Sequence, residues 1–493
     1  MASRKREPAL EIDGMEAGME SDTLYRAIAS RDRRFEGRFV VAVTSTGIYC
    51  RPGCPAKIPL RKNVTFYRHP AAAEAAGFRA CARCRPDAVA WSGTSTTIKR
   101  AMQLIDAGAL GDDGVERLAE RLGVGDRHLR RLFASHVGTS PLQVAQTRRA
   151  HFARQLIDET GLGLAEIAFA AGFGSVRRFN AAMRHAFGRT PSELRARART
   201  RGDGGALTLS VPVRAPYAWA PLVEFLAGRA IPGVEEISGS GADAVYRRTT
   251  ADGGIVSVRA QADGRALVAS LRVPSARGLR DAVERIRRLF DVAADPLAIG
   301  ETLWRDRALR AAVRACPGRR VPGGWNGLEL AIRAILGQQV SVARASQLAG
   351  KLVAAWGTPL GEPDGALAYL FPTARVLADV GGDEIAKVVG MPRARGAAIA
   401  TLAAAVAGGT VALDGTLELD ALVGKLTALP GIGMWTAQYL GMRLGEPDAF
   451  PAGDLWLRRA FDTDERGLLA RAEAWRPFRA YAAMHLWQNE VFK

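Results

Sequence analysis

The segment Leu429-Pro-Gly-Ile-Gly-Met-Trp-Thr-Ala437 sets the architecture of the C-terminal half of the chain. Two glycines separated by one apolar residue permit a tight hairpin, because glycine readily adopts the positive φ angles of such turns. The backbone amides of Gly431 and Gly433 can face a phosphate, as amides at a helix N-terminus do. Amphipathic helical patterns lie on both sides. The segment therefore predicts two helices joined by a hairpin that can hold a phosphate.

Three further segments carry a family resemblance together with this hairpin. They are Pro216-Tyr-Ala-Trp219, Ala331-Ile-Arg-Ala-Ile-Leu-Gly-Gln-Gln-Val-Ser341 and Ala449-Phe-Pro-Ala-Gly-Asp-Leu-Trp-Leu457. Over roughly residues 207–487 the chain resembles 3-methyladenine DNA glycosylase II. The resemblance implies a helix-hairpin-helix glycosylase whose catalytic carboxylate is Asp454. The alternative is that Asp454 is a helix N-cap, which its position after a glycine also suits.

The chemistry of alkylated purines agrees with a single carboxylate. N-alkylation puts positive charge on the purine, so the base leaves without a general acid and oxocarbenium character develops on the sugar. One carboxylate can stabilise that charge and orient water. Relatives that also cleave the strand carry a Lys nucleophile two residues after the second glycine, and here that position is Trp435. We expect a monofunctional glycosylase, without strand cleavage.

The resemblance also implies a base pocket. A lesion must leave the duplex before it is excised, and aromatic faces attract a cationic base. By family position the pocket residues are Trp435, Tyr439, Trp487 and Phe225. Gln339 lies where the family places the side chain that wedges into DNA. Each aromatic side chain could instead belong to the core.

Four of the five cysteines fall in one short segment of the N-terminal part. Cys50 and Cys54 form a Cys-x3-Cys pair, and Cys81 and Cys84 form a Cys-x2-Cys pair after 26 intervening residues. Two thiolate pairs at such spacings can hold one tetrahedral Zn²⁺. A reducing cytoplasm favours zinc over disulfides. Spacing alone leaves open a purely structural zinc ion.

The sequence around these cysteines resembles a known family. Phe39-Val-Val-Ala-Val-Thr-Ser-Thr-Gly-Ile-Tyr-Cys-Arg-Pro-Gly-Cys-Pro55 and Ala76-Gly-Phe-Arg-Ala-Cys-Ala-Arg-Cys-Arg-Pro-Asp87 resemble the N-terminal domain of Ada-type adaptive-response proteins. The resemblance implies that Cys50 irreversibly accepts a methyl group from a DNA methylphosphotriester. Zinc keeps such a thiolate deprotonated at neutral pH. Methylation neutralises one sulfur, which lowers the repulsion between the zinc centre and DNA and gives a physical reason for transcriptional activation.

A duplicated helical pattern follows the cysteines. Val115–Phe133 reads as helix, glycine turn and helix, and residues 164–187 repeat the pattern after a long helix over 142–158. The pair resembles the AraC-type DNA-binding domain, in which the second helix of each unit reads DNA. The alternative is a plain helical packing module. Basic side chains on the second helices are the expected DNA contacts: Arg127, His128, Arg130, Arg131, Arg177 and Arg178.

The charge of the chain favours the same partner. The formal net charge is +18, and residues 1–200 hold 33 Lys and Arg against 20 Asp and Glu. Such a surplus favours a polyanion; an Arg-rich proteome would explain Arg over Lys but not the surplus. No run of about 18 apolar residues and no signal peptide occurs. We expect a cytoplasmic, nucleoid-associated bacterial protein without a membrane partner.

The third part of the chain predicts an antiparallel sheet. Asp252-Gly253 and Asp263-Gly264 are typical hairpin turns, and helical patterns cover residues 220–229 and 276–290. The strand-like runs are Leu207–Val213, Ala244–Thr249, Ile255–Ala260 and Leu267–Val273.

The sequence therefore predicts a multidomain α+β protein. The expected parts are a disordered tail (1–20), a small zinc-binding α/β domain (21–90), an all-α double helix-turn-helix domain (95–195), a linker (196–205), an antiparallel β-sheet domain with flanking helices (206–295) and an all-α helix-hairpin-helix glycosylase domain (296–493). We expect an alkylation-damage response protein that binds alkylated and promoter DNA as a monomer and works with RNA polymerase. The alternative is a transcriptional regulator whose glycosylase-like half only binds or senses DNA.

Overall fold

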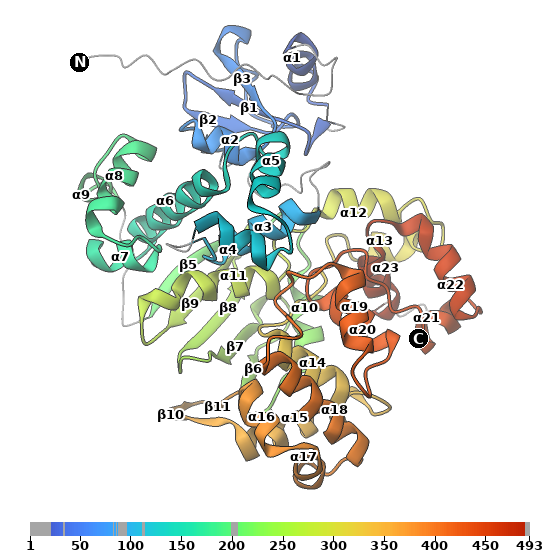
Figure 1. Ribbon diagram of the computed structural model, residues 1–493. Coiled ribbons are helices and arrows are strands. Elements are labelled where there is room, and N and C mark those ends of the chain that lie inside the picture. The colour runs from blue at the N-terminus through green and yellow to red at the C-terminus, as the bar shows by residue number, and fades with distance from the viewer. Residues whose placement is uncertain are drawn as a thin grey trace. The chain divides into compact units, whose positions relative to one another are not determined.

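The computed structural model describes residues 21–32, 35–81, 83–84, 86, 96–110, 114–198 and 206–488 (Figure 1). The chain divides into two compact units, Met1–Thr200 and Arg201–Lys493, and this division falls inside the predicted linker. The predicted disordered tail and most of the linker lie outside the described residues. The finer boundaries between the predicted domains stay predictions.

The first unit begins with a small sheet whose strand order is β3-β1-β2-β4. Alternate residues of a strand face opposite sides of the sheet. Phe39 and Val41 pack with helix α1, whereas Val40 and Ala42 pack with Ala73 of helix α2 on the other side. The elements are α1 (Ser21–Ala29), β1 (Val40–Val43), β2 (Ile48–Cys50), β3 (Val64–Tyr67), α2 (Pro70–Ala75) and β4 (Arg79–Ala80).

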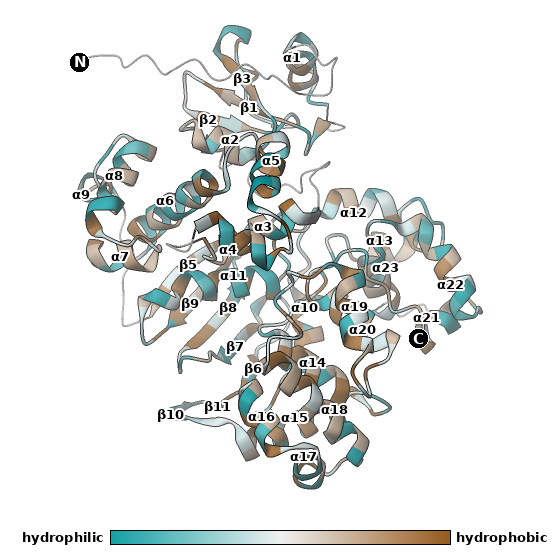
Figure 2. Cartoon of the chain, viewed as in Figure 1, coloured by the Kyte–Doolittle hydropathy of each residue, from teal (hydrophilic) through white to brown (hydrophobic). Residues whose placement is uncertain are grey.

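The same unit continues with two helix-turn-helix pairs, as predicted. Helices α4 and α5 form the first pair, α7 and α8 form the second, and the long helix α6 lies between them in sequence. Ser140 and Ser175 cap α6 and α8 by accepting hydrogen bonds from backbone amides. Figure 2 shows α5 largely hydrophilic. The helices are α3 (Thr96–Asp106), α4 (Gly114–Arg121), α5 (Asp126–His136), α6 (Pro141–Glu159), α7 (Leu164–Ala170), α8 (Val176–Phe187) and α9 (Pro191–Arg195).

The second unit begins with an antiparallel sheet of order β5-β9-β8-β7-β6. The four predicted strands and the two flanking helices are confirmed, and the predicted turns carry Gly253 and Gly264 at φ 85° and 65°. The short edge strand β6 was not predicted. The elements are β5 (Leu207–Pro212), α10 (Trp219–Ala227), β6 (Glu235–Ser238), β7 (Val245–Thr249), β8 (Ile255–Ala260), β9 (Ala266–Arg272) and α11 (Leu279–Leu289).

The rest of the second unit is helical, with one addition. Strands β10 (Thr358–Asp364) and β11 (Leu367–Leu370) form a hairpin that the sequence analysis did not predict. The available signal was Asp364-Gly365, a turn dipeptide. The helices are α12 (Pro296–Leu303), α13 (Arg310–Ala315), α14 (Gly327–Leu336), α15 (Val342–Trp356), α16 (Ala374–Val380), α17 (Gly382–Val389), α18 (Arg393–Ala407), α19 (Leu419–Thr427), α20 (Met434–Arg443), α21 (Leu455–Ala460), α22 (Glu465–Ala472) and α23 (Arg479–Trp487).

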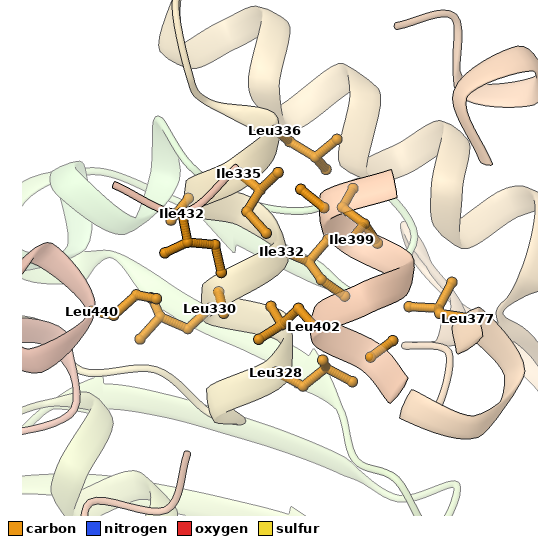
Figure 3. Close-up of a cluster of buried hydrophobic side chains, with 14 of the residues drawn as sticks. Leu328, Leu330, Ile332, Ile335, Leu336, Leu377, Ile399, Leu402, Ile432 and Leu440 are labelled. Carbon is orange, nitrogen blue, oxygen red and sulfur yellow. The ribbon is translucent and has the colours of Figure 1, made fainter. Parts of the chain in front are cut away.

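The helical core lies between α14 and α18 and reaches the hairpin quoted first. Figure 3 shows Ile332 and Ile335 of α14 facing Ile399 and Leu402 of α18, with Ile432 directed into the same cluster. Ile432 is the central residue of the Gly431–Gly433 hairpin and is 4% exposed. The side chain of Ile432 therefore anchors the hairpin in the apolar core.

A buried ion-pair network joins the sheet to α14. Arg248 of β7 pairs with Glu329 of α14 at 2.8 Å, and both side chains are almost fully buried. Arg333, one turn further along α14, pairs with Glu329 at 2.8 Å and donates to the carbonyl of Arg229 at 2.7 Å. These buried ion pairs link the sheet to α14. Among the residues described, no helix is long and apolar enough to cross a membrane.

Candidate functional site

The parallel pairing of β2 with β4 brings the two cysteine pairs together. Tyr49 lies opposite Ala80, so Cys50 at the end of β2 lies beside Cys81. The amide of Cys81 donates to the carbonyl of Tyr49 at 3.0 Å, and the amide of Cys54 donates to that of Arg51 at 3.1 Å. The ligand atoms all lie within 4.8 Å of one another, and they belong to Cys50, Cys54, Cys81 and Cys84.

The crowding of these sulfurs fits a divalent cation. Hydrogen bonding to Cys54 raises the pKa of the Cys50 thiol far above its usual value, and the same bond lowers the pKa of Cys54 to about 2. Four thiolates cannot share so small a space without a positive charge among them. A tetrahedral set of four soft sulfur donors fits Zn²⁺. Cys81 and Cys84 are buried, whereas Cys50 and Cys54 are partly exposed, so a reactant can reach only one of the two cysteine pairs.

The structure places the predicted DNA-reading side chains on solvent-facing surfaces. Arg127, His128, Arg130 and Arg131 lie in the first half of α5 and are exposed, whereas Leu129 of the same turn is buried. Three of these side chains have partners: Arg130 pairs with Glu116 at 2.9 Å, and the guanidinium of Arg131 lies 3.1 Å from the Nδ1 atom of His128.

The second helix-turn-helix pair repeats this arrangement. Arg177 and Arg178 are exposed at the start of α8, and Phe179 beside them is fully buried. Basic side chains at the N-terminal end of the second helix are typical of a helix that enters a DNA groove.

In the second unit, Asp454 lies at the centre of a hydrogen-bonded site. As the N-cap of α21, its Oδ1 atom accepts from the amides of Trp456 and Leu457 at 3.0 and 3.1 Å. The indole of Trp487 donates to Oδ1 at 3.1 Å, and the indole of Trp435 donates to Oδ2 at 3.0 Å. The two interpretations of Asp454 are therefore compatible, because one carboxylate caps the helix and faces the aromatic residues.

Three of the predicted pocket residues gather around this carboxylate. The rings of Trp435 and Tyr439 stack at 5.3 Å with an interplanar angle of 5°, and Trp487 lies 6.2 Å from Tyr439. All three side chains are partly exposed, so they are not simply core. They form an accessible aromatic surface beside a carboxylate.

Phe225 belongs to a buried apolar cluster against which Tyr439 and Trp487 pack. It is 6% exposed, and the guanidinium groups of Arg229 and Arg443 lie 3.7 and 5.0 Å from its ring. Cations therefore already contact Phe225.

Sequence reasoning missed Arg443. This buried side chain donates to the hydroxyl of Tyr439 at 2.5 Å and to the carbonyl of Gly323 at 3.0 Å. Burial alone would raise the pKa of Tyr439. The positive charges of Arg443 and Arg229 nevertheless hold this pKa below its usual value. The available signal was the i,i+4 spacing of Tyr439 and Arg443 on one helix.

The glycine hairpin presents its backbone to solvent. Gly431 has φ 82°, and a Cβ atom there would lie 2.7 Å from the Cβ of Ala398. Gly433 caps α20, and no atom lies within 4 Å of its would-be Cβ. The side-chain amide of Gln338 donates to the carbonyl of Gly431 at 2.9 Å. Gln339 beside it is exposed, with the left-handed φ of 56° that is uncommon for a non-glycine residue.

The two glycines predict different mutant phenotypes. Gly431→Ala should destabilise the second unit by about 1–3 kcal/mol, because it adds a clash and a strained φ. Gly433→Ala should leave the melting temperature unchanged but weaken DNA binding several-fold, because its methyl group occupies the space in front of the amides. Thermal unfolding and fluorescence anisotropy with a DNA duplex measure the two effects. Wild-type affinity in Gly433→Ala would contradict a phosphate contact at this hairpin.

These features define a DNA-repair protein joined to a DNA-binding regulator, and comparisons with known proteins agree. Four family models match the chain: the metal binding domain of Ada over residues 23–87, a helix-turn-helix domain over 118–197, the AlkA N-terminal domain over 208–326, and the HhH-GPD superfamily of base excision DNA repair proteins over 332–466.

Similar proteins cover both units. The probable bifunctional transcriptional activator/DNA repair enzyme AlkA of Mycobacterium tuberculosis is 44% identical over 94% of this chain and 95% of its own length. DNA-3-methyladenine glycosylase 2 of Escherichia coli is 33% identical over 56% of this chain and 95% of its own. The bifunctional activator/repair enzyme Ada of Escherichia coli is 37% identical over 28% of this chain and 38% of its own. The chain belongs to the family of AlkA-type bifunctional transcriptional activator/DNA repair enzymes, with a zinc-binding domain and DNA-binding domains.

Proposed function

We propose that the second unit hydrolyses the N-glycosidic bond of alkylated purines of the 3-methyladenine type. The main support for this proposal is the position of Asp454, which accepts hydrogen bonds from two indoles and two backbone amides beside an accessible aromatic stack. With the lesion flipped out of the duplex, the faces of Trp435 and Tyr439 attract the cationic base. The carboxylate stabilises positive charge on the sugar and orients the attacking water.

The glycine hairpin and the neighbouring Gln339 provide the DNA contacts of the second unit. The exposed amides at Gly431 and Gly433 hold a phosphate, and Gln339 fills the gap that the flipped nucleotide leaves. Because Trp435 stands where relatives that cleave the strand carry a Lys, the chemistry ends with an abasic site. The second unit is therefore monofunctional as a glycosylase, because it excises the base and leaves the strand intact.

We propose a single-use methyl transfer for the zinc centre. The Sγ atom of Cys50 forms a bond to the methyl carbon of a methylphosphotriester, the bond between that carbon and the phosphate oxygen breaks, and a charged phosphodiester leaves. Zinc supplies the stabilisation that keeps the thiolate ionised. The product is a thioether, which removes one negative charge from the centre. The methylated protein then binds its promoters more tightly and acts as a monomer with RNA polymerase.

Base release tests the glycosylase and separates it from the alternative regulator that only senses DNA. The wild-type protein, incubated with DNA that contains 3-methyladenine, should liberate the free base with multiple turnovers. The strand should stay intact until alkali cleaves the abasic site, and borohydride should trap no covalent complex. Binding without base release would favour the regulator, whereas a trapped complex would refute monofunctional chemistry.

A further inference from the structure

A buried polar chain begins next to the methyl acceptor. Tyr49 directly precedes Cys50 on β2, is fully buried, and accepts a hydrogen bond from the amide of Cys81. Its backbone therefore belongs to the frame that holds the two cysteine pairs together. Its hydroxyl donates to the Oε1 atom of Glu74 on α2 at 2.7 Å.

The chain continues from Glu74 to the helices that follow. The side chain of Glu74 is only 3% exposed, and its Oε2 atom lies 3.9 Å from the Nη1 atom of Arg148 on α6. Arg148 also pairs through Nε with Asp106 at the end of α3 at 3.2 Å. Helix α6 connects the two helix-turn-helix pairs. Polar contacts thus run from the zinc strand to the helix between the two DNA-reading elements.

Apolar packing along α2 supports the same connection. Ala71 belongs to the buried cluster of the first helix-turn-helix pair. The Cβ of Ala72 lies 3.5 Å from the place where a Cβ on Gly138 would stand, and Arg68 before α2 donates to the carbonyl of Ser135 at 3.1 Å. Helix α2 therefore packs on the sheet with one face and on the helical domain with another.

We propose that Glu74 is a positioning residue that fixes the zinc centre relative to the paired helix-turn-helix elements. The inference rests on the proposed methyl transfer to Cys50. A change of one charge affects a bound DNA strand only within about one Debye length, roughly 8–10 Å at physiological salt. A zinc domain free to reorient would average that effect away. The Tyr49–Glu74–Arg148 chain keeps the charge change at a constant distance from DNA bound by α5 and α8.

The experiment measures the affinity gain on methylation. The probe is a DNA fragment selected for binding to the wild-type full-length protein, and its affinity is compared before and after exposure to methylphosphotriester DNA. In the wild type the gain should fall in the usual range for coupling between two sites, about 5- to 150-fold. Glu74→Gln and Arg148→Gln remove the ion pair, so their gain should fall toward none while Cys50 still takes up one methyl group.

Matched variants separate positioning from general damage. Arg154→Gln removes an ion pair with Asp158 on the same helix, 2.7 Å long, and should keep the wild-type gain. Arg148→Lys keeps the positive charge and should restore most of the gain. If Glu74→Gln loses its zinc or fails to fold, the Arg148 variants decide the question alone.

Two outcomes of this experiment would overturn two different proposals. Wild-type gain in a folded, methylated Arg148→Gln protein would overturn the positioning role. Failure of the wild-type protein to take up methyl on Cys50 would overturn the proposed methyl transfer instead.

Discussion

An Asp454→Asn protein should release 3-methyladenine at least about 100- to 1000-fold more slowly than the wild type, the usual loss when one stabilising group is removed from a transition state. The amide has no charge to oppose the developing oxocarbenium ion. Asn is also an N-cap residue, so the bonds to the amides of Trp456 and Leu457 and the start of α21 should persist. DNA affinity and melting temperature should therefore stay close to the wild-type values.

A second N-cap aspartate provides the control. Asp464 caps α22 through a bond to the amide of Gly467 at 2.8 Å, and it is no part of the aromatic site. Asp464→Asn makes the same chemical change at another helix and should leave base release unchanged. Single-turnover rates on DNA that contains one lesion compare the two variants. Wild-type rates in Asp454→Asn would show that another group stabilises the sugar and would remove Asp454 from catalysis.

The second large effect concerns Cys50. Exposure to methylphosphotriester DNA should add one methyl group per chain, located on Cys50, and Cys50→Ala should take up none. The uptake stops at one methyl group because the thioether product is a poor nucleophile and the proposed reaction has no step that regenerates the thiol. Peptide mass spectrometry identifies the modified residue, and zinc content shows whether the variant keeps its metal.

Cys316 serves as the matched control for this experiment. It is a buried cysteine of the second unit and no member of the sulfur cluster. Cys316→Ala should accept one methyl group like the wild type. A methyl group found on Cys54, Cys81 or Cys84 would refute the assignment of the acceptor, while zinc binding by the four residues would still stand.

The parts of the fold that the sequence predicted are those with strong local patterns. Strands β7, β8 and β9 of the second unit are short runs of strand-forming residues separated by Asp-Gly turns, and the paired helix-turn-helix motifs repeat their spacing. β6 and the β10–β11 hairpin lack such a run of strand-like residues, although Asp364-Gly365 marks the turn between β10 and β11. Proline and glycine dominate the region of β10, and the hairpin contacts residues distant in sequence, as in the hydrogen bond from the hydroxyl of Thr249 to the carbonyl of Tyr369 on β11 at 2.8 Å. Local sequence carries little information about that kind of contact.

The candidate sites were predicted unevenly for a related reason. Cysteine spacing identified four ligands, because short spacings leave few geometries for a metal. The family resemblance predicted that Trp435, Tyr439 and Trp487 lie near Asp454. It could not predict that Phe225 lies beside two guanidinium groups. Arg443 escaped notice because a lone arginine on an amphipathic helix usually faces solvent. Only the tertiary structure shows it buried beneath Tyr439.

The close approach of the four sulfurs makes the zinc centre sensitive to zinc starvation and to peroxide. Sulfur atoms within 4.8 Å of one another oxidise to disulfides readily once their metal is gone. The aromatic site of the second unit holds no cysteine and needs no metal in the proposed chemistry. Zinc starvation or peroxide should therefore abolish methyl acceptance by the first unit while base release by the second unit continues, which a comparison of the two activities before and after chelation measures.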